Sequence, residues 1–144
     1  MSDPYPDQIS ALARWSLIQA LWPPALVAAI SIAHSLVAPE AYGSSLAIVA
    51  RLAAIAGAGA VLAVSAILFF DALLFRLMAS YEDEQKGGAA VDDILARMRL
   101  KPVPPQTRSL ANRAAGTRRL VRLQRVALTV FIVALGLPLL AVAA

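Results

Sequence analysis

Cysteine is absent from the 144-residue sequence, which excludes disulfide bonds, thiolate metal sites and cysteine nucleophiles. Histidine occurs once, at His34, so a single chain cannot supply both axial ligands of a two-histidine haem site. Charged residues account for only 15% of the chain, whereas hydrophobic residues account for 60%. This is more apolar material than the core of one soluble domain of this size needs, so the composition predicts a membrane protein.

Aromatic residues are also scarce, and their distribution argues against nucleic-acid binding. Eleven of the 13 lysines and arginines lie between Arg76 and Arg125, and Tyr81 is the only aromatic residue among them. Proteins that bind single-stranded nucleic acid combine basic residues with aromatic side chains on which the bases stack. Because the basic residues here flank apolar runs instead, the net charge of +4 indicates membrane lipids with anionic headgroups as partners.

Three long apolar segments predict an all-α membrane protein with three transmembrane helices. The first segment covers residues 15–38 and follows a polar N-terminal stretch, residues 1–14. Because Pro23 and Pro24 cannot donate backbone hydrogen bonds, a kink is expected there. In the alternative, residues 9–22 lie along the membrane interface and a shorter span begins at Pro23.

The second predicted span covers residues 48–72. It contains nineteen consecutive uncharged residues, 52–70, between Arg51 and Asp71. At about 1.5 Å per residue, this stretch covers roughly the 30 Å hydrocarbon core of a bilayer. A charge at mid-bilayer is costly, so the position of Arg51 and Asp71 at the two margins is typical of a true span.

Residues 73–125 form a long segment between the second and third spans. Its first part is predicted to extend the second helix until Gly87 and Gly88 end it. An amphipathic helix is predicted at residues 91–100, and a basic juxtamembrane helix follows it. Since a helix of ten residues is marginal alone, its apolar face must dock on lipid, on the protein's own helices or on a partner. This face consists of Val91, Ile94, Leu95 and Met98.

Asp92 and Asp93 are a candidate ligand pair for a metal-bound diphosphate. Enzymes that bind magnesium in this way need a second acidic cluster, and we assign none to this role in the sequence. We therefore interpret both residues as solvated side chains at the start of the amphipathic helix.

The charge asymmetry predicts the orientation of the chain. Residues 71–125 contain eleven basic residues, whereas the predicted outer turn, residues 39–47, contains only the acidic Glu40. The positive-inside rule puts the long segment in the cytoplasm. The N-terminus is then cytoplasmic, and the third predicted span, residues 126–144, ends on the outer side. The chain is expected to be a multi-pass protein of the bacterial inner membrane.

His34 is the one candidate for binding a cofactor. With Ser31 and Ser35 it forms a polar patch near the outer end of the first span, and polar residues within a membrane are functional candidates by default. It can contact a pigment, a haem or a quinone, or it can bond a neighbouring helix or interfacial water. The sequence gives no reason to assign a cofactor or a metal.

Two further groups of residues predict contact surfaces. Small residues at four-residue spacing in the second span allow close helix packing, within the protein or with other integral membrane proteins. Arginines before the third span are expected to contact anionic lipid or an acidic partner, or simply to stop the span at the inner face. The packing residues are Ala53, Gly57 and Ala60, and the arginines are Arg118, Arg119, Arg122 and Arg125.

The function expected from these features is not enzymatic. The sequence predicts a non-catalytic accessory subunit or assembly protein of a bacterial inner-membrane complex. His34 alone suggests an electron-transfer chain. The alternative is a small homo-oligomeric pore-former or transporter component, although no carboxylate lies within the core of a predicted span to carry protons.

Overall fold

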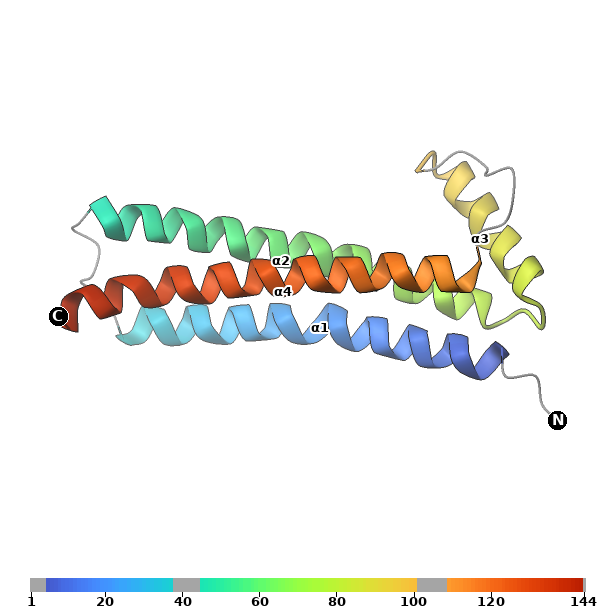
Figure 1. Cartoon of the computed structure of the whole chain (residues 1–144), viewed down its shortest axis with the longest axis horizontal. Helices are drawn as coiled ribbons and strands as arrows, with labels where there is room; N and C mark the ends of the chain where they lie inside the picture. Colours follow the sequence, from blue (N-terminus) through green and yellow to red (C-terminus); the bar gives the residue numbers. More distant parts are fainter. Residues whose placement is uncertain (1–4, 38–44, 101–108, 144) are drawn as a thin grey trace. The chain divides into compact units, whose positions relative to one another are not determined.

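The structure is a computed structural model that describes residues 5–37, 45–100 and 109–143. Within these ranges all regular elements are α-helices: α1 (Tyr5–Val37), α2 (Ser45–Met78), α3 (Glu84–Arg97) and α4 (Leu110–Ala143) (Figure 1). By length and composition, α1, α2 and α4 are each capable of crossing a membrane. The predicted all-helical class is confirmed, as is the presence of three candidate spans.

The long helices extend beyond the predicted spans. α1 begins at Tyr5 and continues through Pro23 and Pro24, so residues 9–22 and the apolar stretch after them belong to one helix. α4 joins the predicted basic helix and the third apolar segment without interruption, as expected from a stretch with no proline before residue 138. Most of the predicted outer turn lies outside the described residues, and α2 begins at Ser45.

The predicted end of the second helix at Gly87 and Gly88 is wrong. α2 ends at Met78, and both glycines are buried inside α3. A Cβ atom at Gly87 would lie 3.0 Å from the Tyr5 hydroxyl and 3.1 Å from the Met78 carbonyl oxygen. The glycine therefore permits close packing of α3 against Tyr5 and Met78. The tendency of glycine to end helices does not reveal this role.

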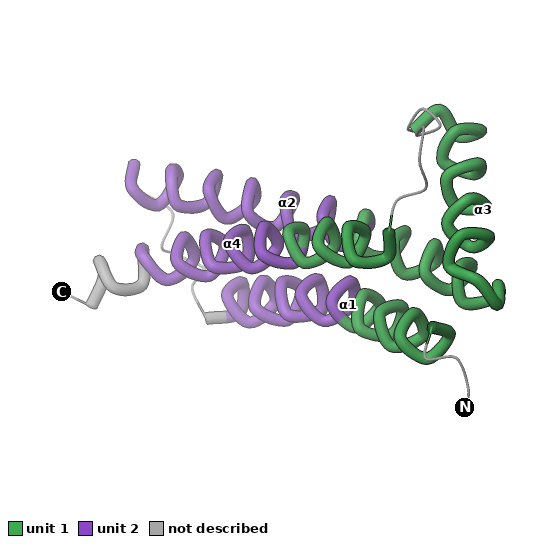
Figure 2. The backbone as a smooth tube through the Cα atoms, turned by 45° about the vertical axis from the view of Figure 1, so that its right-hand side comes forward, with its two compact units in different colours: residues 1–18, 67–120 green, residues 19–66, 121–144 purple. Residues whose placement is uncertain are grey.

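The chain forms two compact units (Figure 2). Each of the three long helices contributes one segment to each unit. Unit 1 comprises residues 1–18 and 67–120, and so includes the whole of α3. Unit 2 comprises residues 19–66 and 121–144.

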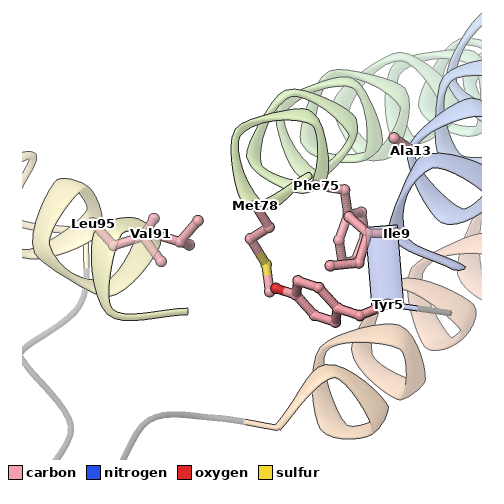
Figure 3. Close-up of a cluster of buried hydrophobic side chains, with 7 residues drawn as sticks. All are labelled: Tyr5, Ile9, Ala13, Phe75, Met78, Val91 and Leu95. Atoms are coloured by element: carbon pink, nitrogen blue, oxygen red, sulfur yellow. The ribbon is translucent and has the colours of Figure 1, made fainter. Parts of the chain in front are cut away.

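Unit 1 has an apolar core to which α1, α2 and α3 contribute (Figure 3). Val91 of α3 and Met78 of α2 are completely buried in it, as is Ile9 of α1. Full burial of a side chain of this size contributes about 1.5 to 3 kcal/mol where the alternative is exposure to water. The other buried members are Tyr5, Ala13, Phe75 and Leu95.

Both ends of α3 are capped by local hydrogen bonds. At its start, the Asp83 side chain accepts from the backbone N–H of Gln85 at 3.0 Å. At its end, the Leu100 N–H donates to the Leu95 carbonyl and the Arg99 N–H to the Ala96 carbonyl. This is a Schellman motif, and its left-handed residue is Arg99, with φ at 55°, where glycine is usual. The helix thus ends at Arg97, before the predicted limit of residue 100.

Unit 2 packs α1, α2 and α4 around a second apolar core. A Cβ atom at Gly57 of α2 would lie 3.0 Å from the backbone nitrogen of Phe131 and 3.1 Å from the Ala127 carbonyl. The missing side chain therefore lets α2 and α4 approach closely, as small residues do in membrane proteins. The buried members of this core are Val27, Ala54, Val61, Leu128, Phe131 and Ala134.

A polar bridge in unit 2 explains how α1 accommodates a proline in its interior. Pro23 has no N–H, so the carbonyl of Gln19, four residues earlier, lacks its usual helical donor. The buried amide nitrogen of Gln124 in α4 donates to that carbonyl at 3.0 Å. The same nitrogen donates to the Ser65 hydroxyl of α2 at 2.7 Å. One side chain thereby bonds both neighbouring helices and supplies the bond that Pro23 removes.

Candidate functional site

A cavity of about 270 Å³ lies in unit 2 among α1, α2 and α4. Its polar wall carries His34, Ser31 and Ser35 of α1 and Arg51 of α2. The rest of the lining is apolar and consists of Ala47, Ala54, Ile55, Ala58, Phe131, Ala134 and Leu135.

Helix periodicity explains why α2 provides both space and charge. Ala47, Arg51, Ala54 and Ala58 recur every three or four residues, and therefore lie on one face of the helix. Three of these four residues are alanines, which leave room for the cavity. The fourth, Arg51, is an exposed residue that also lines the cavity.

The three polar residues predicted on the first span do lie together on the cavity wall. His34 is half-buried there, and the Ser35 hydroxyl donates to the Ile32 carbonyl at 2.8 Å. The sequence did not associate Arg51 with this patch, because it was interpreted only as the marker of a span margin. Its position six residues inside α2, within an otherwise uncharged stretch, is the signal that was available.

The predicted small-residue face is used only in part within unit 2. Gly57 is buried against α4, and Ala53 is half-buried against the same core. Ala60 is exposed, so it is not part of that packing.

The amphipathic helix docks on the protein's own helices through part of its predicted face. Val91 and Leu95 are buried in the core of unit 1 and Ile94 is half-buried, whereas Met98 is 54% exposed. The apolar face was predicted to dock on lipid, on a partner or on the chain's own helices. The chain's own helices cover the centre of this face.

The interpretation of Asp92 as a solvated side chain is wrong. Asp92 is buried and forms an ion pair with Arg113 of α4, with 2.7 Å between Oδ1 and Nη2. The two side chains are only 9% and 11% exposed. Asp93 does lie at the surface, where it pairs with Arg97 at 2.9 Å.

A second polar contact in unit 1 joins α2 to α4. The buried Thr117 hydroxyl donates to Oδ2 of Asp71 at 3.0 Å and lies 3.2 Å from the Arg113 carbonyl. Asp71 was interpreted only as a span margin, so this contact was not predicted. The predicted basic residues of α4, Arg118, Arg119, Arg122 and Arg125, are all exposed.

Among residues 5–37, 45–100 and 109–143, no cluster of three acidic or histidine side chains is arranged to hold a metal ion. Comparison with models of protein families, with curated proteins and with solved structures finds no match for this chain.

Proposed function

We propose that the chain is a non-catalytic accessory subunit or assembly protein of a bacterial inner-membrane complex. In this proposal α1, α2 and α4 cross the membrane, α3 lies in the cytoplasm and the C-terminus is on the outer side. The exposed arginines in the first half of α4 support the orientation, because basic residues are retained at the cytoplasmic face.

The proposal is supported chiefly by the buried polar side chains, which bond one helix to another. Five polar or charged side chains are buried among the described residues, and all but Ser16 bond a side chain of another helix. They stabilise the packing of helices, which is the property a scaffold requires. The four are Ser65, Asp92, Thr117 and Gln124.

Large apolar side chains cover the outside of the candidate spans. Leu36 is 77% exposed, and Val49, Leu52 and Val126 are each more than 60% exposed. Such surfaces face lipid or another transmembrane helix. At the end of α3, Met98 and Leu100 are also more than half exposed beside Arg97 and Arg99, which gives a small amphipathic surface for a partner.

Photo-crosslinking in native membranes tests the proposal. A photoreactive residue is introduced at Met98, and in a second variant at Leu62, which is 55% exposed on α2. Gly57, on the predicted packing face, is not a suitable position for the photoreactive residue because it is buried against α4. We expect both probes to give irradiation-dependent adducts with a defined set of integral membrane proteins.

A probe at Lys86, exposed at the opposite end of α3, is the matched control for Met98. If both probes yield only adducts with lipid or with copies of this chain, the accessory role is wrong. A series of self-adducts, together with loss of membrane potential on expression, would support the pore-forming alternative. The suggested role in electron transfer rests on His34 alone. Co-purification of a redox protein with the chain would support that role.

A further inference from the structure

We infer that a surface of unit 2 formed by Gln19, Arg122 and Arg125 binds the phosphate of an anionic phospholipid at the inner face of the membrane. α1 supplies Gln19, and α4 supplies the two arginines. The inference rests on the membrane crossing and orientation proposed above, but not on the accessory role.

The bond between Gln124 and Gln19 brings the donors of the two helices to one level. Gln124 lies between Arg122 and Arg125 in α4. Its amide nitrogen is 3.0 Å from the Gln19 carbonyl of α1. Trp22 lies three residues after Gln19, is 39% exposed, and donates its indole N–H to Oε1 of Gln19 at 3.1 Å. The arginines therefore lie at the same level of unit 2 as the exposed polar groups of α1.

The two arginines lie on the side of α4 that faces away from α2. Gly57 of α2 packs against the backbone of Ala127 and Phe131, which marks the side of α4 that faces α2. Successive residues are about 100° apart around a helix, so Arg125 lies about 160° from Ala127. Arg122 lies about 60° from Arg125 on the neighbouring turn. Both side chains are exposed and lie toward α1, the other helix that packs against α4 in unit 2.

This level coincides with the start of the apolar part of α4. Residues 126–143 are uncharged. At about 1.5 Å per residue they extend about 27 Å, close to the roughly 30 Å hydrocarbon core of a bilayer. Tryptophan is enriched at such an edge, because its ring is amphipathic. Arg122 and Arg125 thus lie where lipid phosphates are found.

The apolar stretch of α2 is compatible with the same membrane surface. Ser65 accepts from the Gln124 amide at 2.7 Å, so it marks this level on α2. The uncharged residues of α2 continue through Phe70, five residues further. Five residues extend about 7.5 Å, which is comparable with the headgroup layer of about 5 to 7 Å on each side of the core.

The donors suit a phosphate. A guanidinium group can form two parallel hydrogen bonds with phosphate oxygens, and charge-assisted bonds of this kind are stronger than neutral ones. Among the described residues, neither Arg122 nor Arg125 forms an ion pair with an acidic side chain. Because Trp22 donates to Oε1 of Gln19, Nε2 of that amide is the group left to donate to a ligand.

The acidic residues outside the described ranges are remote from this surface along α1. Asp3 precedes α1, and Glu40 follows it. The helix extends about 21 Å from Tyr5 to Gln19 and about 27 Å from Gln19 to Val37. The positive charge of the surface is thus available to an anion from outside the chain.

Apolar side chains adjoin the donors on both helices and favour a lipid as the ligand. Leu21 of α1 is 58% exposed, and Val126 of α4 is 62% exposed. A phospholipid carries a phosphate for the donors and acyl chains that cover these side chains. A soluble acidic peptide would pair with the arginines but leave the apolar side chains exposed.

The test measures tryptophan fluorescence of the full chain in nanodiscs. Trp15→Phe leaves Trp22 as the only tryptophan. The nanodiscs contain phosphatidylcholine with one fifth phosphatidylglycerol. Bromine atoms, which quench a nearby indole, are placed on the acyl chains of the phosphatidylglycerol or of an equal amount of the phosphatidylcholine. We expect brominated phosphatidylglycerol to quench Trp22 at least about threefold more than brominated phosphatidylcholine.

Two double variants, both in the Trp15→Phe background, test the arginines. Arg122→Gln with Arg125→Gln should bring the ratio of quenching to about one, because the charge at the level of Trp22 is lost. Arg118→Gln with Arg119→Gln is the matched control, since it removes the same charge from exposed positions of the same helix. The control should keep at least about half of the preference, because its arginines lie nearer the start of α4.

Gln19→Leu tests the amide donor. It keeps both arginines and the backbone carbonyl that Gln124 contacts. We expect a ratio of quenching between that of the Trp15→Phe chain and that of the Arg122→Gln, Arg125→Gln variant. Circular dichroism verifies that each variant is folded.

The possible failures are distinguishable. If neither brominated lipid quenches Trp22, α1 does not enter the bilayer, and the proposed membrane crossing fails together with the inference. Equal quenching by the two lipids in the Trp15→Phe chain would leave the crossing intact and refute the inference. An equal loss of preference in the two double variants would indicate diffuse surface charge without a defined site. Loss of the preference on addition of polyglutamate or of millimolar inorganic phosphate would assign the surface to an acidic peptide or to free phosphate.

Discussion

Arg113 and Asp92 form an ion pair at 2.7 Å in which both side chains are about nine-tenths buried, although 21 residues separate them in the chain. The pair fixes α3 to the start of α4 in unit 1. Arg113 also donates to the Gly88 carbonyl of α3 at 3.4 Å.

Removal of one member of this pair should be strongly destabilising. Asp92→Asn removes the buried carboxylate that pairs with Arg113. Arg113→Met removes the guanidinium that pairs with the buried Asp92 carboxylate. We expect either change to lower the free energy of unfolding by about 3 to 5 kcal/mol. Chemical unfolding in detergent, monitored by circular dichroism, measures the effect.

Asp93→Asn is the matched control, because Asp93 pairs with Arg97 at the surface, where the side chains are 56% and 78% exposed. Its cost should stay below about 1 kcal/mol. Equal losses for Asp92→Asn and Asp93→Asn would contradict the assigned role of the buried pair.

Gly57 and Gly59 should respond oppositely to alanine. A methyl group at Gly57 meets the backbone of α4 at 3.0 to 3.1 Å, which neither helix can relieve by rotating a side chain. Gly57→Ala should therefore destabilise unit 2 by about 1 to 3 kcal/mol. A methyl group at Gly59 meets no atom of the described residues within 4 Å. Gly59→Ala should be neutral or stabilising by up to about 1 kcal/mol, and thermal melts of the two purified variants provide the comparison.

Pro23 and Gln124 should be energetically coupled. Gln124→Leu leaves the Gln19 carbonyl without a donor, at an expected cost of about 1 to 3 kcal/mol. In a Pro23→Ala background the new N–H of residue 23 supplies that donor, so the same substitution should cost at least about 1 kcal/mol less. The loss of the Ser65 bond is common to both backgrounds and cancels in the double-mutant cycle.

Thr129→Val, which removes only an exposed bond to the Arg125 carbonyl on the same helix, is the control. It should leave stability nearly unchanged in either background. An additive result for Pro23→Ala and Gln124→Leu would mean that the amide does not replace the missing helical donor.

The absence of cysteine makes the proposed orientation directly measurable. A single cysteine at Ser45, exposed at the start of α2, should react with a membrane-impermeant maleimide in intact cells. A single cysteine at Met98 should react only after the cells are permeabilised. Labelling of Met98→Cys in intact cells, with protection of Ser45→Cys, would reverse the topology.

Hydropathy and helix periodicity predicted the long helices and the apolar face of α3, because these depend on neighbouring residues in the sequence. They did not predict the partners of Asp92 and Asp71, which lie on α4, 21 and 46 residues away in the chain. Local rules also misinterpreted Gly87. It packs tightly against α2 and does not end a helix, and only the tertiary contact distinguishes these roles.

One long-range contact was nevertheless accessible from the sequence. A proline within a helix identifies the carbonyl four residues earlier as one that needs a donor from elsewhere. Pro23 thus identifies Gln19, and Gln124 is the single amide side chain near the start of the third apolar segment. Proline chemistry together with the position of this amide therefore indicates a contact between α1 and α4.

The bridge between Gln124 and Gln19 also has a consequence for how the protein is made. The two residues are 105 positions apart, so the donor leaves the ribosome long after α1 has been synthesised. If α1 and α4 cross the membrane as we propose, the newly made first helix carries a carbonyl without its helical donor until α4 inserts beside it. Membrane proteases and chaperones that recognise incompletely assembled helices would therefore act on α1 during this interval, and nascent chains that stop before residue 124 would be cleared fastest.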